Sequence, residues 1–242
     1  ATPYTVCFTA ADSSGITQAT PASVSFTTTA LASYSSPQWL PVGTAGFTND
    51  AATWTSLAFA PDGAPWLAFK DAYAYDLATV KRFDGSNWNS IGDDGMSTAP
   101  VLSTALGFAP NGVPFATFGL TPDSNGIVLG MGYSNSYGWD LLSYSDYLGY
   151  GDGMIAQSIN PDGTLAVAFR DISNSRASVT LYYDGDFAYF SDISADTVDY
   201  LTIASAPDNS IYLAYSDNSV GGKATVKKLD ESGLWSTIGS DG

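Results

Sequence analysis

The chain has 242 residues, of which 45% are hydrophobic, so it has enough apolar material for a substantial core and global disorder is excluded. Its apolar runs are about the length of a strand and fall far short of the ~20 residues that cross a membrane as a helix. With 24 acidic and 8 basic residues the net charge is −16, which argues against nucleic acid and anionic membranes as partners.

The absence of histidine excludes imidazole acid–base chemistry, Ser-His-Asp catalysis and histidine metal sites. Cys7 is the only cysteine, so the chain has no internal disulfide. Only one acidic residue is Glu, and the abundant aspartates are expected in turns between strands because Asp favours turns and caps. Frequent Ser, Thr, Gly, Asn and Tyr with scarce Lys and Glu indicates an extracellular or cell-surface protein.

Residues 1–30 contain two strand-like runs, 4–11 and 22–28, joined by a turn-rich segment. In one interpretation these runs are the second and third strands of an incomplete repeat unit, and Asp12 corresponds to strand-end aspartates further along. In the other, TPYTVCFTAADSSG followed by SVSFTTT resembles the last two strands of a fibronectin type III or bacterial Ig-like domain. Residues 39–242 then hold the repeats alone.

From residue 55 onward a hairpin-like stretch recurs four times, with two short apolar runs around a Pro-containing turn such as Pro-Asp-Gly. The turn prolines, 46 to 51 residues apart, are Pro61, Pro110, Pro161 and Pro207. Each hairpin is followed by a third apolar run, at 77–83, 126–132, 177–183 and 224–229. A fourth short run then carries an aromatic landmark, Trp88, Trp139, Phe187 or Trp235, and Trp39 marks the same run before the first hairpin.

Four short antiparallel strands repeated at this period predict an all-β fold, a β-propeller of five four-stranded blades with an incomplete first blade. The predicted blades cover residues 1–46, 47–95, 96–146, 147–194 and 195–242. The landmark tryptophans are expected to pack between adjacent blades. Because 1–46 lacks a first strand and the ending GSDG looks like another inter-blade loop, we expect the natural chain to continue beyond Gly242 as part of a larger chain or assembly.

Aspartates mark the ends of the second strands (Asp71, Asp171 and Asp217) and the loops between blades (Asp94 and Asp152), which this topology brings to one face. They either cap turns by accepting backbone N–H groups or contribute to a Ca²⁺ site, since carboxylates and carbonyls are its usual ligands. No other cofactor is indicated.

Aromatic side chains that fall outside the landmark positions, together with these aspartates, are candidates for contacting a ligand. Trp54 precedes the first hairpin, and Tyr147 and Tyr150 lie in a tyrosine-rich segment before the third hairpin. Aromatic faces beside Asp and Asn suit stacking on sugar rings, and they equally suit a protein surface.

The repeat skeleton of residues 39–242 resembles that of the five-bladed tachylectin-2 type of lectin. SNWNSIGDDG and FAPNGVPFATF carry the likeness. The resemblance implies multivalent carbohydrate binding with one site per blade. The main hypothesis is therefore a non-catalytic extracellular recognition or adhesion module. Its alternatives are a structural module of a filament or surface layer and, third, a glycan hydrolase or lyase.

Overall fold

The computed structural model describes residues 2–8, 22–28, 39–121, 126–142, 148–230 and 232–239. The chain divides into two compact units, Ala1–Val42 and Gly43–Gly242. In the first unit, β1 (Thr2–Phe8) and β2 (Ala22–Thr28) form an antiparallel hairpin in which Thr2 pairs with Thr28. Asp12 lies outside the described residues. The interpretation of 1–46 as an incomplete blade and its Ig-like alternative both remain predictions.

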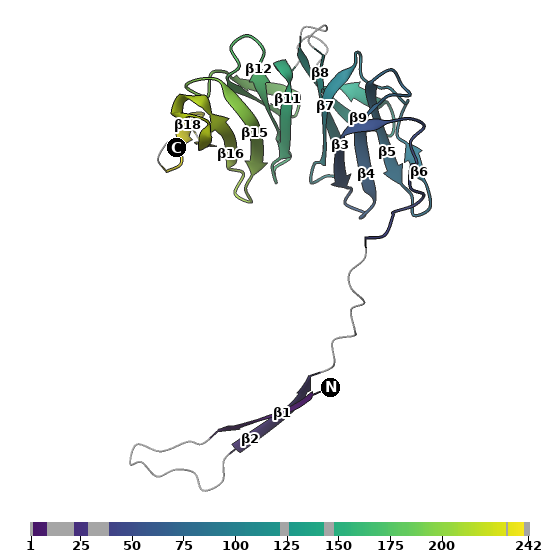
Figure 1. The fold of residues 1–242 in the computed structure, drawn as a ribbon, viewed down its shortest axis with the longest axis vertical. Coiled ribbons are helices and arrows are strands. Elements are labelled where there is room, and N and C mark those ends of the chain that lie inside the picture. Colours follow the sequence, from purple (N-terminus) through teal and green to yellow (C-terminus); the bar gives the residue numbers. More distant parts are fainter. Residues whose placement is uncertain are drawn as a thin grey trace. The chain divides into compact units, whose positions relative to one another are not determined.

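The second unit consists of four groups of four antiparallel strands, here called blades I to IV (Figure 1). Blades II and III are joined into one eight-stranded sheet, because Gly149 and Tyr150 pair with Val128 and Ile127. Blade I contains β3 (Ala52–Phe59), β4 (Pro65–Asp71), β5 (Leu77–Phe83) and β6 (Trp88–Ser90). Blade II contains β7 (Val101–Phe108), β8 (Pro114–Leu120), β9 (Ile127–Ser134) and β10 (Gly138–Leu141). Blade III contains β11 (Gly149–Ile159), β12 (Leu165–Asp171), β13 (Ala177–Tyr183) and β14 (Asp186–Phe190). Blade IV contains β15 (Val198–Ser205), β16 (Ile211–Asp217), β17 (Lys223–Leu229) and β18 (Trp235–Thr237).

Within each blade the strands pair in chain order, so the predicted all-β propeller architecture is confirmed. Blades I to IV correspond to the second to fifth predicted blades. The count of five blades and the predicted blade boundaries remain predictions. In the described residues the only helix is a short 3₁₀ turn, η2 (Asn218–Val220), and no helix there is long and apolar enough to span a membrane.

The first two strands of each blade are joined by the expected tight turns. In blade I the Ala60 N–H donates to the Ala64 carbonyl at 2.9 Å, and Asp62 Oδ1 accepts from the Ala64 N–H at 2.9 Å. Gly63 has φ +83°, a left-handed conformation that glycine adopts without a Cβ penalty. The Pro-Asp-Gly sequence therefore closes this hairpin for a local, stereochemical reason.

The core lies in the joints between blades. Joint I–II buries Trp66, Ala68, Val80 and Leu106 in one cluster, joint II–III centres on Val128 and Phe169, and joint III–IV includes Ala168, Val179 and Ile203. These clusters replace a single central core, as expected for a radial array of sheets.

Three of the four landmark tryptophans pack against a neighbouring segment or blade. Trp139 Nε1 donates to the Ile91 carbonyl of blade I at 2.7 Å, and Trp235 lies edge-on to Phe190 of blade III at 6.2 Å. Trp88 stacks on Phe47, which precedes its blade, at 4.6 Å. Trp39 belongs to the first unit and is fully exposed, and its packing between blades stays a prediction. The described part of its PQWLPVG segment, residues 39–43, forms no strand.

Candidate functional site

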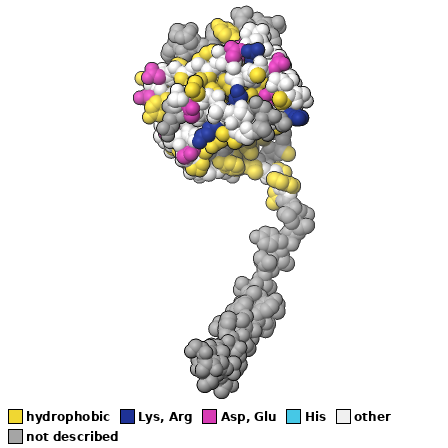
Figure 2. All heavy atoms as spheres, turned by 90° about the vertical axis from the view of Figure 1, so that its left-hand side faces the viewer, with side chains coloured by type: hydrophobic (Ala, Val, Ile, Leu, Met, Phe, Trp, Pro, Cys, Tyr) yellow, Lys and Arg dark blue, Asp and Glu magenta, His cyan; other side chains and the backbone are white. Residues whose placement is uncertain are grey.

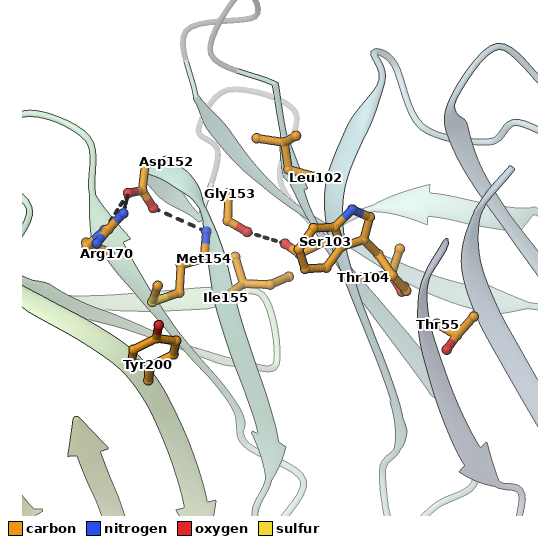
Figure 3. A pocket seen from close by; sticks show the side chains of 11 residues that line it. Thr55, Leu102, Ser103, Thr104, Asp152, Gly153, Met154, Ile155, Arg170 and Tyr200 are labelled. Atoms are coloured by element: carbon orange, nitrogen blue, oxygen red, sulfur yellow. Dashed lines mark hydrogen bonds and ion pairs between the residues drawn. The ribbon is translucent and has the colours of Figure 1, made fainter. Parts of the chain in front are cut away.

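The innermost strands of the four blades line one pocket. β3, β7, β11 and β15 lie side by side in this order. Near one end, each of them has a shift in register against the second strand of its own blade. The pocket has a volume of about 530 Å³ and lies at this irregular end (Figure 3). It is lined by Trp54, Thr55, Leu102, Ser103, Thr104, Asp152, Gly153, Met154, Ile155, Arg170 and Tyr200.

Two aromatic residues in this pocket, Trp54 and Tyr200, share an unusual backbone conformation. Trp54 has φ 50° and Tyr200 has φ 51°, and their side chains are 59% and 85% exposed. Each residue stands seven positions before the turn proline of its blade. A bulky residue with positive φ is a strained outlier, and such outliers concentrate at functional sites. The same left-handed backbone conformation, seven residues before the turn proline, therefore positions both aromatic side chains at the pocket.

An ion-pair cluster connects blades III and IV at the pocket. Arg170, on β12, binds Asp152 Oδ2 and also donates from Nη1 to Asp199 Oδ1 at 2.6 Å, as Figure 3 shows for Arg170 and Asp152. Nη1 lies 3.2 Å from the Val198 carbonyl as well. The Arg170 side chain is about a quarter exposed and Asp152 slightly less. Arg170 and Asp152 therefore line the pocket, and Asp199, which is not among the lining residues, helps to hold Arg170 in place.

Hydroxyl groups on β7 of blade II form hydrogen bonds to the inner strands of both neighbouring blades, β3 and β11. Thr104 Oγ1 donates to the Trp54 carbonyl at 2.5 Å, and Ser103 Oγ donates to the Gly153 carbonyl at 2.5 Å. The first bond holds the backbone of the left-handed Trp54, and the second holds Gly153, which has φ +97°. The irregular strand ends are therefore tied together across the blade joints, which makes the pocket preformed.

The three strand-end aspartates predicted as ligand contacts act as turn caps in the structure. Asp71 Oδ1 accepts from the Tyr73 N–H at 3.0 Å, Asp171 Oδ1 from the Ser173 N–H at 2.8 Å, and Asp217 Oδ1 from the Ser219 N–H at 3.0 Å. Asp71 also accepts from Thr79 Oγ1 at 2.9 Å. None of the three lines the pocket. The capping interpretation accounts for their hydrogen bonds.

Burial raises the pKa of Asp217, but hydrogen bonds from the Ser219 side chain and backbone outweigh burial and lower the pKa from its ordinary value of 3.8. The carboxylate form of this cap is therefore favoured in the folded protein.

The remaining predicted site residues fall in different places. Asp152 and Trp54 line the pocket, whereas Asp94 forms an ion pair with Lys81 at 3.5 Å and accepts from Ser90 Oγ at 2.6 Å. Tyr150 lies on β11, 51% exposed, and is not among the pocket-lining residues. Tyr147 lies outside the described residues. Sequence analysis thus placed two of its candidates in the pocket.

The predicted Ca²⁺ site finds no ligand cluster in the described part of the chain, where no group of three or more Asp, Glu, His or Cys side chains converges.

Sequence analysis missed Tyr200 and the pairing of Arg170 with Asp152 and Asp199. Tyr200 could have been found, because it has the same seven-residue spacing to a turn proline as Trp54. Arg170 and Asp199 carry no such signal, since their pairing depends on how blades III and IV are placed side by side.

Neither a protein-family model nor a curated protein matches the sequence. Solved structures with a similar fold include the SapL1 lectin in complex with α-methyl fucoside, with 15% identity, a TM-score of 0.57 and coverage of 77% of this chain and 63% of that one. AofleA from Arthrobotrys oligospora has 12% identity, a TM-score of 0.55 and coverage of 78% and 58%. A variant of the Aleuria aurantia lectin in complex with Fucα1-6GlcNAc has 13% identity, a TM-score of 0.53 and coverage of 77% and 62%.

These similarities confirm a β-propeller fold shared with lectins. The chain spans less than two thirds of the length of these similar chains.

Proposed function

We propose that this chain is a non-catalytic carbohydrate-recognition module that acts outside the cell or at its surface, with the pocket between Trp54 and Tyr200 as its sugar site. The observation that carries the proposal is the pair of exposed aromatic residues, held at equivalent repeat positions in a strained conformation, beside a charged cluster. Structural strain of this kind is retained where function needs it.

The pocket offers the two kinds of contact that a pyranose needs. The faces of Trp54 and Tyr200 present apolar surfaces for the C–H side of a ring. The carboxylate of Asp152 and the guanidinium of Arg170, which both line the pocket, offer an acceptor and donors to hydroxyl groups, and hydrogen bonds to charged groups are the stronger ones. A volume of about 530 Å³ falls within the usual range for small-ligand sites. Two of the structural neighbours were solved with fucose-containing ligands, which supports a sugar as the ligand class.

The same contacts favour binding over turnover. Asp152 and Asp199 both engage Arg170, which commits these oxygens to ion pairs instead of nucleophilic attack or proton transfer. Glycoside hydrolysis requires one carboxyl group as acid and a second as base or nucleophile.

The pocket is built from all four blades, and Ser103 and Met154 occupy, in blades II and III, the position that Trp54 and Tyr200 have in blades I and IV. This favours one axial site over one site per blade.

A glycan array with the full chain, followed by calorimetry on the best glycan, tests the proposal. Trp54→Ala and Tyr200→Ala should each weaken binding at least tenfold, because stacking on an aromatic face is lost. Tyr75→Ala is the matched control: Tyr75 is 87% exposed and has φ 59°, but it does not line the pocket. The proposal would be refuted if the chain binds no glycan, or if the pocket variants and the control bind with equal affinity. It would also be refuted if the chain releases reducing ends from a bound glycan.

A further inference from the structure

Joints I–II and III–IV share one construction from two halves, whereas joint II–III has Gln157 at the position that Leu106 and Ile203 occupy. The later blade contributes large side chains of its first strand, here called the entry face. The earlier blade contributes small side chains of its second and third strands, here called the exit face. In joint I–II, Leu106 is 8% exposed and belongs to one cluster with Ala68 and Val80. In joint III–IV, Ile203 is 6% exposed and belongs to one cluster with Ala168 and Val179.

The entry face of blade I has no such cover. Leu57 occupies the position of Leu106 and Ile203 relative to the turn proline, yet it is 58% exposed. Phe59, two positions further along β3, is 65% exposed, while the equivalent Phe108 is half-buried against the I–II cluster. Ala58 of the same strand and Ala60, directly after it, pack against the I–II cluster. β3 therefore presents a complete apolar entry face with nothing packed on it in the described unit.

The exit face of blade IV is uncovered in the same way. Val226 pairs in register with Ala214, as Val80 does with Ala68 and Val179 with Ala168. Val80 and Val179 are fully buried, whereas Val226 is 36% exposed. Ala224 is exposed, although its counterparts Ala78 and Ala177 are fully buried. Figure 2 views the molecule from the side where Figure 1 places β18 and shows apolar side chains among charged ones on this surface.

We propose that the exit face of blade IV of one molecule docks on the entry face of blade I of a second copy of this chain. A second copy is the occupant because both halves of the joint lie on the same molecule, and because the same type of joint already forms between blades of one chain. Such a head-to-tail contact is heterologous, and it continues the apolar packing of the array across two molecules.

The charge of the chain gives this contact a distinctive salt dependence. Each copy carries a net charge of −16, so two copies repel each other at low ionic strength. The side chains that the proposal brings together, such as Leu57, Phe59 and Val226, are apolar, so screening removes the net repulsion without weakening their contact. Self-association therefore becomes stronger as salt is added, opposite to an interface held by ion pairs.

Sedimentation velocity of the full chain over a range of concentrations and salt concentrations tests this proposal. The wild-type chain should associate reversibly, more strongly at high salt. Leu57→Asp on the entry face and Val226→Asp on the exit face should each weaken association at least about 30-fold, the effect of a central interface residue. Tyr75→Asp, which changes a more exposed hydrophobic residue outside both faces, should associate like the wild type.

Mixing the two variants gives the decisive result. A Leu57→Asp molecule keeps its exit face and a Val226→Asp molecule keeps its entry face, so an equimolar mixture should form a heterodimer that neither variant forms alone. Circular dichroism confirms that both variants fold, as expected for substitutions at exposed positions. The proposal is overturned by a wild-type chain that stays monomeric at every concentration, or by a mixture no more associated than its components.

If the β1–β2 hairpin of the same chain covered the entry face instead, the full chain would remain monomeric. In a Cys7→Ser background, Leu57→Cys would then react slowly with a thiol reagent, and this outcome also overturns docking of a second copy.

Discussion

Tyr200 provides the most direct test of the strained pocket. Replacing it with glycine should raise stability relative to alanine and, at the same time, abolish sugar binding. Tyr200→Gly and Tyr200→Ala both delete an 85% exposed side chain, so they remove almost the same small buried area. They differ in the backbone, where φ is 51°. Alanine keeps the steric conflict of a Cβ in the left-handed region, whereas glycine removes it.

The magnitude follows from two opposing contributions. A Cβ in the left-handed region costs roughly 1–2 kcal/mol, which glycine avoids. Glycine in turn gives the unfolded chain more conformational freedom, which costs roughly 0.5–1 kcal/mol relative to alanine. The Gly variant should therefore exceed the Ala variant by about 1 kcal/mol in free energy of unfolding. For a domain of this size about 1 kcal/mol corresponds to a rise in Tm of roughly 2–4 °C.

Thermal and urea denaturation of the two variants measure this difference, and calorimetry with the bound glycan measures the functional cost. Both variants should lose sugar binding, so the Gly variant combines higher stability with no ligand. The control is the same pair at Thr202, two residues along β15, where φ is not positive and Gly should be less stable than Ala. A Tyr200→Gly variant no more stable than Tyr200→Ala would refute the strained conformation.

Two further predictions concern the caps and the blade joints. Asp217→Ala should lower the free energy of unfolding at pH 7 by about 1 kcal/mol, because Asp217 caps η2. Because folding lowers the pKa of Asp217, its ionised carboxylate stabilises the fold above the ordinary pKa of 3.8, and this stabilisation is lost as the pH falls through the folded value. In urea denaturation, the difference in free energy of unfolding between the wild type and Asp217→Ala should therefore be smaller at pH 3 than at pH 7. An equal difference at both pH values would contradict this. Trp139→Phe keeps an aromatic ring against Tyr133 but loses the hydrogen bond to the Ile91 carbonyl, and should cost about 1 kcal/mol in the same assay; an unchanged midpoint means that this bond does not stabilise joint I–II.

The blades could be predicted from the sequence because their signals are local. A turn proline followed by Asp-Gly or an equivalent pair determines where each hairpin closes, and the apolar runs on either side determine which residues pair. Trp39 shows the limit of this approach, since its motif matches the landmark but the described part of its segment, residues 39–43, forms no strand. Asp71, Asp171 and Asp217 were identified as a repeated set, yet the sequence alone could not separate a cap from a ligand contact. Their hydrogen bonds to nearby N–H groups provide that separation.

The pocket was harder to predict because its parts come from different blades. Arg170 is on β12, Asp152 on β11 and Asp199 on β15, and only the packing of blade IV on blade III brings them together. The left-handed φ of Trp54 and Tyr200 likewise arises where the register of the first strand shifts against the second. Hydrophobic alternation does not report such a shift, so the sequence pattern predicts a regular strand there.

The two proposals meet at the ends of the four-blade array. Within one molecule the aromatic position before the turn proline is Trp54 in blade I and Tyr200 in blade IV, whereas Ser103 and Met154 occupy it in the blades between them. Among blades I to IV, no two neighbours therefore carry aromatic residues at this position. Docking blade IV on blade I of a second copy makes these two blades neighbours. The joint then sets Tyr200 of one molecule beside Trp54 of the next, and self-association adds a second aromatic pair of the kind that the proposed sugar site uses.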